Sequence, residues 1–351
     1  MVAGRLAGST PVMIAFGVMD SLRLSQIAGR FAGQRILVAG DLMLDEFLWG
    51  QVSRISPEAP VPVVEVTSES YYPGGAANVA RNVREFTTGT ALMGVAGADS
   101  QGDLLLSLLA EGGIDTSAVQ RDAAQSTTVK TRVIARNQQV VRVDRERRTP
   151  LSPAGTDLAI GRLRRCMGDL DGIIVADYGK GFLTQALADA ICGLAGEHGK
   201  ILTVDPHPHT SLAWKGATAI KPNRTEAYLA AGLAPSGPDM PAKGGGVVME
   251  AGRRLLEAWQ PGSLLITLGE QGMVLFESGR APYHIPTRAK EVFDVSGAGD
   301  TAIAVLTLAL CAGASPAEAA ELANCASGIA VGKLGTATVT MAELQGSLAT
   351  G

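Results

Sequence analysis

The chain has 351 residues, 46% of them hydrophobic and 18% charged, which is enough to bury one large core and excludes a disordered protein. Its 30 basic and 34 acidic residues give a net charge of −4 and are spread along the chain, which argues against nucleic acid and anionic membranes as partners and favours small molecules. The four cysteines form no CxxC pair, so we expect reduced core residues in a cytoplasmic protein.

Residues 1–34 are predicted to be an N-terminal extension of one main domain that covers residues 35–351. The apolar run PVMIAFGVM in this extension is too short to span a bilayer and precedes no A-x-A cleavage site, so we expect neither a membrane anchor nor a signal peptide. The following SLRLSQIAGRF predicts an amphipathic helix that leads into the first strand. We expect the extension to be loosely attached.

The first predicted strand is RILVAG, residues 35–40, a short apolar run that ends in glycine. Asp41 and Asp45 follow at once. Because ligands collect beyond the carboxyl ends of parallel strands, both carboxylates are candidate ligand-site residues.

Three segments alternate between β-branched and polar residues: VPVVEV (61–66), TTVKTRVIA (127–135) and QQVVRVDRE (138–146). Such alternation is typical of a half-exposed antiparallel sheet. We therefore predict a small separate β lid, formed from segments near 47–70 and 127–146.

The predicted lid leaves strand edges and an apolar face to cover, with residues such as Val61, Val63, Val129 and Val141. Open edges and apolar patches favour association with another chain. We therefore expect a homodimer that pairs through the lid.

Between the lid segments, Gly74 and Gly75 open a predicted helix that carries Asn78, Arg81 and Arg84. Paired glycines allow the backbone to approach a ligand closely, because they carry no side chain.

From residue 172 onward, apolar strands alternate with helices: GIIVADYG, KILTVD, ATAIKPN and SLLITLG are the predicted strands. This alternation predicts a parallel sheet covered by helices on both faces. Polar or small residues occur at or just after the predicted strand ends, so one edge of the sheet would form a polar site; they are Asp41, Asp177, Asp205, Asn223 and Gly269.

The octapeptide DVSGAGDT, residues 294–301, predicts an anion site with a base attached. Gly297, Ala298 and Gly299 precede an apolar run with the composition of a buried helix, and the N-terminus of such a helix binds phosphate. Asp300 follows in the first turn, where its carboxylate can accept the proton of a hydroxyl that attacks this phosphate. A glycine-rich turn whose aspartate only caps the helix explains the octapeptide equally well.

Other nucleotide-binding motifs are missing from the sequence. GIAVGKL (328–334) has one residue too few between its glycines for a Walker A loop and lacks the following Ser or Thr, and no GxGxxG follows a strand. His207 and His209 in DPHPH have no nearby cysteine partners, so we interpret them as loop residues rather than metal ligands.

Three stretches in order, GGAANVARN, KPNRTEA and DVSGAGDT, resemble the signatures of the ribokinase-like sugar kinases, the PfkB family, over residues 35–344. Within that family, YPGGAANVARNV and ADYGKGF resemble the heptose 7-phosphate kinases of lipopolysaccharide core synthesis. The resemblance implies an α/β ribokinase-like fold, a mostly parallel sheet with helices on both faces plus a β lid. It also implies ATP-dependent phosphorylation of the anomeric hydroxyl of D-glycero-D-manno-heptose 7-phosphate to the 1,7-bisphosphate.

The resemblance also implies roles at the nucleotide end of the site. Asp300 would be the base, Gly297, Ala298 and Gly299 the anion hole, and Asn223 with Glu226 would organise Mg²⁺ through water. Residues that would line the ATP cleft are Thr267, Gly269, Gly272 and Asn324, with Ala323 and Ser327 leaving room for adenine. Close helix packing explains these small side chains nearly as well.

At the sugar end, the resemblance implies that carboxylate, amide and backbone groups bind the hydroxyls: Asp41, Asp45, Gly74, Gly75 and Asn78. The sugar already carries a phosphate, so cations are needed, and the candidates are Lys180, Arg132, Arg142 and Arg81. Lys180 is favoured because it lies in the glycine-flanked turn YGKGF at a strand end.

Two other functions remain open from the sequence: a different sugar kinase of the family, acting on ribose, fructose phosphate or a ketodeoxy sugar acid, or a sugar-sensing protein without turnover. The presence of both GAGD and NxxE argues against the sensor, because a binder needs no base. The sequence ends soon after VTMAEL and contains no HxGH-type motif, so we expect the adenylylation that some relatives also perform to belong to another protein.

Overall fold

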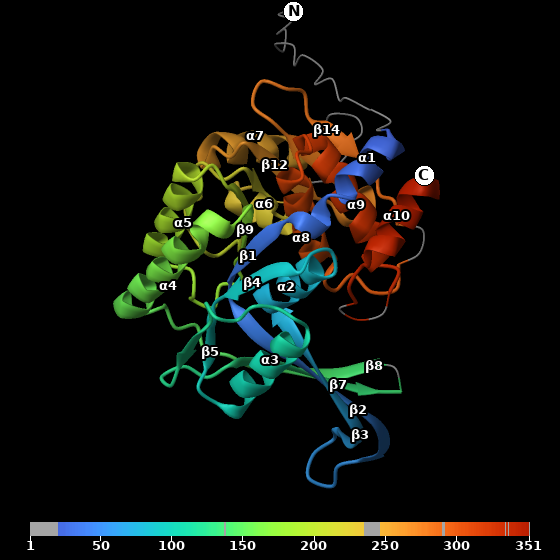
Figure 1. The fold of residues 1–351 in the computed structure, drawn as a ribbon. Coiled ribbons are helices and arrows are strands. Elements are labelled where there is room, and N and C mark those ends of the chain that lie inside the picture. The colour runs from blue at the N-terminus through green and yellow to red at the C-terminus, as the bar shows by residue number, and fades with distance from the viewer. Residues whose placement is uncertain are drawn as a thin grey trace, which may run out of the picture.

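The computed structural model describes residues 20–136, 138–234, 246–289, 292–333, 335 and 337–350. Its centre is an eight-stranded sheet in the order β14-β13-β12-β11-β10-β9-β1-β4, in which β13 runs antiparallel to both β12 and β14 and the other neighbours are parallel (Figure 1). The strands are β1 (Arg35–Gly40), β4 (Gly89–Met93), β9 (Gly172–Ala176), β10 (Ile201–Asp205), β11 (Ala219–Ile220), β12 (Ser263–Thr267), β13 (Met273–Phe276) and β14 (Tyr283–Ile285). The predicted mostly parallel sheet is therefore confirmed.

Helices cover both faces of this sheet, as the alternating pattern predicts. One face packs against α1 (Ser21–Ala28), α2 (Ala76–Arg84), α3 (Ser100–Glu111), α8 (Ala298–Cys311), α9 (Pro316–Ala330) and α10 (Met341–Thr350). The other packs against α4 (Pro153–Cys166), α5 (Gln185–Glu197), α6 (Arg224–Ala230) and α7 (Val247–Trp259). Single-turn 3₁₀ helices are η1 (Phe31–Gly33), η2 (Met167–Asp169) and η4 (Gly269–Gln271).

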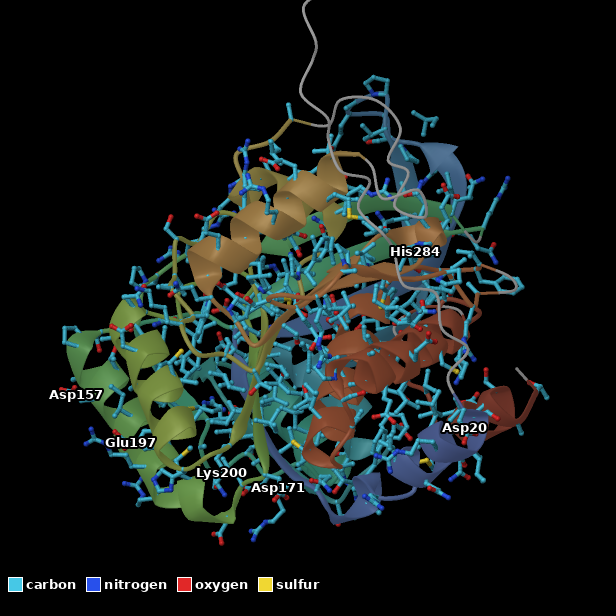
Figure 2. All side chains as sticks on the ribbon, turned by 90° about the horizontal axis from the view of Figure 1, so that it is seen from above. Asp20, Asp157, Asp171, Glu197, Lys200 and His284 are labelled. Atoms are coloured by element: carbon cyan, nitrogen blue, oxygen red, sulfur yellow. The ribbon has the colours of Figure 1, made fainter. Side chains whose placement is uncertain are left out.

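Strand β1 shows why two cores form. Ile36 and Val38 lie in the core under α2 and α8, whereas Leu37 and Ala39 lie in the core under α4 and α5, because successive side chains of a strand point to opposite faces. A strand that is buried on both faces reads as a continuous apolar run. Charged side chains such as Asp157 and Glu197 lie outside these layers, on the outer surface of α4 and α5 (Figure 2).

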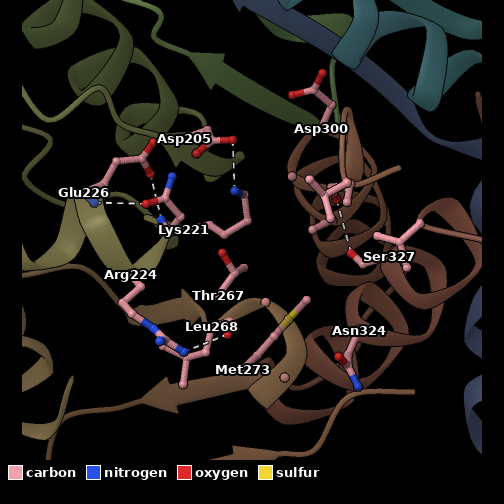
Figure 3. A pocket seen from close by; sticks show the side chains of 18 of the residues that line it. Asp205, Lys221, Arg224, Glu226, Thr267, Leu268, Met273, Asp300, Asn324 and Ser327 are labelled. Atoms are coloured by element: carbon pink, nitrogen blue, oxygen red, sulfur yellow. Dashed lines mark hydrogen bonds and ion pairs between the residues drawn. The ribbon is translucent and has the colours of Figure 1, made fainter. Parts of the chain in front are cut away.

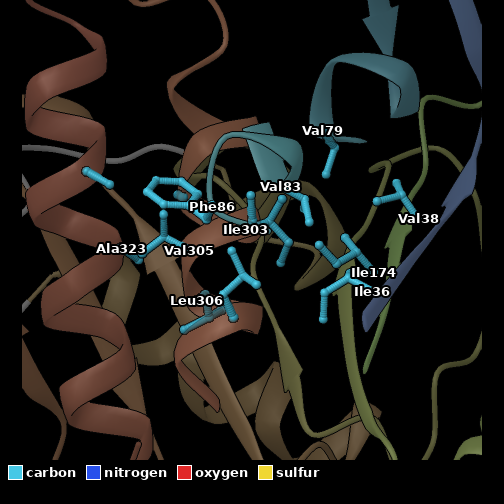
Figure 4. Packing of buried hydrophobic residues seen from close by; sticks show 14 of the residues in the cluster. Ile36, Val38, Val79, Val83, Phe86, Ile174, Ile303, Val305, Leu306 and Ala323 are labelled. Carbon is cyan, nitrogen blue, oxygen red and sulfur yellow. The ribbon is translucent and has the colours of Figure 1, made fainter. Parts of the chain in front are cut away.

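Helix α8 is buried on all sides, which is typical of a helix that is apolar all round. Its side chains, among them Ile303 and Leu306, pack beside Val83 of α2 and Ile174 of β9 (Figure 4). The hydroxyl of Thr301 donates to Asn82 Oδ1 at 2.7 Å, so the buried polar group is paired. This packing fixes the N-terminal end of α8 against the sheet.

The lid is a second sheet, in the order β3-β2-β7-β8, and projects from the body of the molecule (Figure 1). Its strands are β2 (Leu42–Ile55), β3 (Pro62–Gly75), β7 (Thr128–Ala135) and β8 (Gln138–Arg145). The purely antiparallel lid expected from the sequence is wrong at its centre, because β2 pairs with β7 in parallel. Strands β2 and β3 also extend further into the body than residues 47–70. A separate pair, β5 (Val95–Gly97) and β6 (Gln120–Asp122), is parallel.

The predicted helix of the N-terminal extension is present as α1, but its loose attachment is wrong for the described part. Leu24, Ile27 and Phe31 are fully buried in the core that also contains α8 and α10. Burying each such side chain contributes about 1.5–3 kcal/mol, so residues 20–34 are part of the folded body. Residues 1–19 lie outside the described residues.

Within the part of the chain that the structure describes, no helix has the length and apolar character needed to cross a membrane. Each of the four cysteines is free.

Candidate functional site

A cleft of about 900 Å³ lies along the carboxyl edge of the central sheet (Figure 3). Four of the predicted strand-end residues line it: Asp177, Asp205, Asn223 and Gly269. The sequence prediction of a polar site at this edge is therefore confirmed for these four positions.

Asp41, the fifth strand-end residue, has a different position from the one the sequence suggests. Its carboxylate is 3% exposed and accepts hydrogen bonds from the backbone N–H groups of Tyr178, Lys180 and Phe182, each at 3.0 Å. A buried carboxylate with three donors is already satisfied, so Asp41 holds the turn after β9 in place. The expectation that Asp41 binds a sugar hydroxyl does not fit this geometry.

The N-terminus of α8 opens into the cleft. Gly297 is the residue before the helix and has φ 80°, a left-handed conformation that favours glycine. A Cβ added at Gly299 would contact, within 4 Å, only Lys221 Nζ at 3.7 Å, so the space in front of this first turn is open. The first N–H groups of a helix lack partners within the helix, and they can therefore bind an anion here.

Asp300 lies in that first turn and faces the cleft. Its Oδ1 accepts a hydrogen bond from the hydroxyl of Tyr178 at 2.7 Å, and its Oδ2 accepts one from Asn78 Nδ2 at 2.6 Å. Burial raises the pKa of Asp300 to about 6, although these two donors oppose the shift. The carboxylate is thus a stronger base than a free aspartate and still ionised at pH 7 to 8.

Lys221 is a site residue that the sequence reasoning missed. Its side chain is 3% exposed, and its ammonium group forms an ion pair with Asp205 at 2.9 Å (Figure 3). Burial disfavours the charged lysine, but Asp205 and Glu226 outweigh this effect and raise the pKa of Lys221. A permanent positive charge therefore lies beside the open terminus of α8.

Asn223 and Glu226, the predicted metal pair, form the capping box of α6. Asn223 Oδ1 accepts from the Glu226 N–H at 3.0 Å, and Glu226 Oε2 accepts from the Asn223 N–H at 2.7 Å. Both residues line the cleft. Their side chains consequently stabilise a helix end whether or not they also serve a ligand.

The charge of the cleft fits a divalent cation. Burial raises the pKa of Glu226 to about 7 and also raises that of Asp205, and together with Asp300 these carboxylates face one ammonium group, Lys221. Three carboxylates and one ammonium leave an uncompensated negative charge when ionised. Among the described residues, no three or more His, Cys, Asp or Glu side chains gather in a group that could hold a metal directly.

The predicted nucleotide residues come together at the other end of the cleft: Thr267, Gly269, Gly272, Asn324 and Ser327 all line it. Asn324 Nδ2 donates to Pro286 O at 2.8 Å and so holds the segment after β14. Gly272 has φ 81° and leaves no room for a Cβ against Ile285 O, so the tight turn itself requires glycine. Ala323 was expected at this wall as well, but it is buried in the core beside α8 (Figure 4).

Among the predicted sugar residues, Asn78 contacts Asp300, and Gly74 lies against Asp45. Asn78 comes from α2, and Gly74 and Gly75 precede it at the end of β3. Asp45 lies within strand β2, and its Oδ2 occupies the space that a Cβ at Gly74 would fill. Its Oδ1 accepts a hydrogen bond from Arg132 Nη1 at 2.5 Å.

Three of the four predicted phosphate-binding cations, Lys180, Arg132 and Arg142, are already paired with carboxylates. Lys180 Nζ lies 2.6 Å from Glu146 Oε2, and Lys130 Nζ lies 3.5 Å from the same atom. Arg142 pairs with Asp144 at 2.9 Å and is half exposed. Lys130 was missed, although it alternates with Arg132 along β7 and therefore shares its face.

Arg81, the fourth predicted phosphate-binding cation, lies beside Tyr72 and Asn78. The guanidinium carbon of Arg81 lies 5.8 Å from the ring centre of Tyr72, and Arg81 Nη1 donates to Asn78 Oδ1 at 3.3 Å. His207 lines the cleft and His209 packs beside it, with ring centres 5.5 Å apart. Burial lowers the pKa of His207, which favours the neutral ring.

A family model described as "pfkB family carbohydrate kinase" matches residues 34–343. The bifunctional protein HldE of Geobacter metallireducens is 45% identical over 312 residues, which cover 89% of this chain and 62% of that protein. HldE of Desulfatibacillum aliphaticivorans is 44% identical over 318 residues, which cover 91% of this chain and 64% of that protein. The chain therefore spans less than two thirds of the length of these relatives.

Solved structures with the same fold include two kinases. Phosphofructokinase-2 from Escherichia coli has a TM-score of 0.70 at 18% identity and covers 90% of this chain and 98% of its own. Ribokinase from Thermotoga maritima has a TM-score of 0.67 at 20% identity, with 90% and 99% covered. The fold of this chain is thus the ribokinase-like α/β fold with a small separate sheet.

Proposed function

The chain belongs to the pfkB family of carbohydrate kinases, and from this premise we propose that it phosphorylates the anomeric hydroxyl of D-glycero-D-manno-heptose 7-phosphate. ATP is the proposed phosphoryl donor and the 1,7-bisphosphate the product, which would serve the synthesis of the lipopolysaccharide inner core. The heptose assignment draws on the resemblance of YPGGAANVARNV and ADYGKGF to heptose 7-phosphate kinases and on the identity to the HldE proteins.

The observation that carries the proposal is the position of Asp300 at the junction of cleft and lid. Its carboxylate lies in the first turn of α8, beside N–H groups that can hold a γ-phosphoryl group, and contacts Asn78 from the sugar side. A hydroxyl bound between Asp300 and the phosphoryl group would lose its proton to the carboxylate as the new P–O bond forms. Positioning and charge supply most of the catalysis in such reactions.

We place the adenine of ATP between α9 and the loop before α8. Val292 and Val295 in that loop are 62% and 69% exposed, line the cleft, and would be covered by a flat apolar base. The triphosphate would then run past Thr267 and Asn223 toward Lys221. Lys221 would neutralise charge on the transferred phosphoryl group.

Mg²⁺ is the proposed cofactor, with Asn223 and Glu226 holding it through water. When bound, the ion supplies positive charge to the phosphate oxygens. Burial raises the pKa of both Asp205 and Glu226, and a nearby cation would favour their ionised forms, which supports this placement.

At the sugar end, we assign the hydroxyls to Asp45, Asn78 and the backbone at Gly74 and Gly75. The 7-phosphate would bind to the lid cations, with Lys180 as the principal contact. A phosphate dianion can replace Glu146 as the partner of Lys180, because it carries more charge and more acceptor oxygens than a carboxylate. Arg132 and Arg142, which face each other on β7 and β8, are the other proposed contacts.

We further propose that the enzyme is a homodimer that pairs through its lid, in the cytoplasm. Val61 and Val141 are about half exposed, and Trp49 is also exposed, which supports an uncovered apolar lid surface. Val129 does not belong to this surface, since it is 3% exposed and packs in the core. Four free cysteines and the use of ATP agree with a reducing compartment.

The experiment that tests the function is a kinase screen with ATP and Mg²⁺, in which ADP release is measured across sugars and sugar phosphates. Heptose 7-phosphate, heptose, ribose, fructose 6-phosphate and a ketodeoxy sugar acid form the panel, and phosphorus NMR locates the new phosphate. We expect turnover with heptose 7-phosphate to exceed that with the others by at least tenfold. Equal turnover of unphosphorylated heptose would refute the substrate assignment, and preferred turnover of another sugar would replace it.

A further inference from the structure

Tyr178 reaches Asp300 from the turn after β9, and nothing in the sequence motifs assigns it a role. Its hydroxyl donates to Asp300 Oδ1 at 2.7 Å, across 122 positions of sequence. The ring packs partly against the core, and burial together with the nearby carboxylates of Asp300 and Asp205 raises the pKa of the phenol. Tyr178 therefore keeps its proton throughout the working pH range.

Asp41 holds the backbone of the turn that carries Tyr178. The buried Asp41 carboxylate accepts hydrogen bonds from the N–H groups of Tyr178, Lys180 and Phe182. A turn held at three backbone donors has little freedom, and the phenol that this turn carries contacts Asp300.

The two oxygens of Asp300 face donors of different kinds. Asn78 must present its NH₂ group to Oδ2, because its own Oδ1 accepts a hydrogen bond from Arg81 Nη1 and a carboxylate has no hydrogen to give. An amide NH₂ can only donate. The hydroxyl of Tyr178, at Oδ1, can donate or accept.

This difference decides which oxygen carries a proton more readily. A proton on Oδ2 would leave the NH₂ group of Asn78 donating to a hydroxyl oxygen, which is a weaker acceptor than a carboxylate oxygen. A proton on Oδ1 causes no such loss, because the phenol can rotate about its C–O bond and become the acceptor.

We propose that Tyr178 is a positioning residue for the catalytic base: it holds Asp300 in the ionised state and makes Oδ1 the oxygen that receives the proton of the sugar hydroxyl. The inference rests on the proposed kinase function. In the step, the sugar O–H bond breaks and an O–H bond forms at Oδ1. The sugar oxygen bonds to the γ-phosphorus, and the bond from that phosphorus to the bridging oxygen breaks to leave ADP. The phenol proton stays on Tyr178.

The first test is a direct titration of Asp300, by NMR of protein labelled with ¹³C at the aspartate carboxyl carbon, with the signal assigned through Asp300→Asn. Tyr178→Phe removes a donor to the ionised carboxylate, so the titration midpoint should rise by roughly one pH unit. Tyr283→Phe is the matched control, because its hydroxyl also donates to a carboxylate, Glu321, at 2.7 Å but away from the cleft. An Asp300 midpoint that is unchanged in Tyr178→Phe overturns the proposal.

The second test is kinetic. In Tyr178→Phe, the acidic limb of kcat should move to higher pH with the titration midpoint, so kcat at pH 6 should fall by about fivefold, and the KM for ATP should stay within twofold. In an Asp300→Asn background, Tyr178→Phe should cause no further loss of kcat, because Tyr178 acts through Asp300. If kcat of the double variant is lower than kcat of Asp300→Asn alone, the inference is contradicted.

A third variant covers the case in which Tyr178→Phe does not fold. Incorporation of 3,5-difluorotyrosine at position 178 keeps the hydroxyl and makes it a stronger donor, so the midpoint of Asp300 should move down instead of up. An unchanged or raised midpoint there also overturns the proposal. The titrations need no substrate, so failure of the proposed function appears as a wild-type enzyme without the expected turnover. Failure of this inference appears as an active enzyme in which substitution of Tyr178 does not change the titration midpoint of Asp300.

Discussion

Asp300→Asn is the substitution that tests the site most directly. It removes the proposed proton acceptor and leaves the side-chain shape. General-base catalysis contributes about 10²- to 10⁴-fold, and at 1.36 kcal/mol per factor of ten this corresponds to about 2.7–5.4 kcal/mol of barrier. We therefore expect kcat to fall by that factor in a steady-state assay of ADP release.

The hydrogen bonds of Asp300 explain why binding should survive. An asparagine can place its carbonyl oxygen toward Asn78 and its NH₂ group toward Tyr178, whose hydroxyl can rotate and accept. The anion hole at Gly299, Lys221 and the capping box are untouched. Calorimetry should give ATP and sugar affinities within a few-fold of wild type.

Stability should change in a predictable direction. The pKa of Asp300 is about 6 in the folded chain, above its ordinary value of 3.8, so the ionised carboxylate lowers folding stability above pH 6 and has no such effect below about pH 4. Asp300→Asn removes this charge. The Tm at pH 8 should equal or exceed that of wild type, whereas the two should converge near pH 4.

The pH dependence gives a second signature of the base. In wild type, kcat should fall as the pH drops through about 6, where Asp300 gains a proton. The residual activity of Asp300→Asn should lack this limb. Near-normal turnover in a folded Asp300→Asn protein would refute the reasoning and leave Asp300 as a helix-terminal residue.

Three other predictions follow from the site. Lys221→Met should lower kcat by at least tenfold with little change in the KM of the sugar, as measured by steady-state kinetics, since Lys221 faces the phosphoryl end; an unchanged kcat would count against its role. Lys180→Met should raise the KM of the sugar phosphate and leave the KM of ATP nearly constant, and the exposed Lys215→Met is its control; a rise in both for Lys180→Met would contradict the placement. Light scattering at micromolar concentration should report a dimer, and Trp49→Glu on the lid should shift it toward monomer, whereas a monomeric wild type would refute the lid interface.

The sequence predicted those elements whose pattern depends on local burial. Strand β1 and helix α8 are uninterrupted apolar runs, and the structure places both in the core. The first turn of α8 was predicted with Gly297 before the helix and Asp300 within it, because small residues before an apolar run mark such a terminus. These features need no knowledge of distant contacts.

Strand β2 could not be recognised from its own residues. Its first four residues, LMLD, are buried, and the other ten are partly buried or exposed on the lid, so no single period runs through it. Its parallel pairing with β7 joins segments about 85 residues apart, and alternation within each strand does not reveal direction. The lid was consequently predicted too short and purely antiparallel.

Asp41 and Lys221 show why residue type alone does not reveal a role: Asp41 was predicted to bind the sugar, and Lys221 was missed. An aspartate after a strand end looks like a ligand residue, but Asp41 is satisfied by three N–H groups of a turn far along the chain. A single lysine is usually solvated, so Lys221 gave no signal, although Asp205 and the sheet edge bury it. Both outcomes depend on which strands become neighbours.

The charges of these residues together affect where an anion can bind in the cleft. A cleft lined by carboxylates is unfavourable for the triphosphate of the proposed ATP substrate, unless positive charge lies where the phosphates end. Lys221 and the terminus of α8 supply that charge at one point, next to Asp300, while the carboxylates of Asp205 and Glu226 line the rest of this part of the cleft. The phosphoryl group to be transferred is therefore held best at the position where the base can reach its attacker. A phosphate bound elsewhere along the cleft would face carboxylates instead.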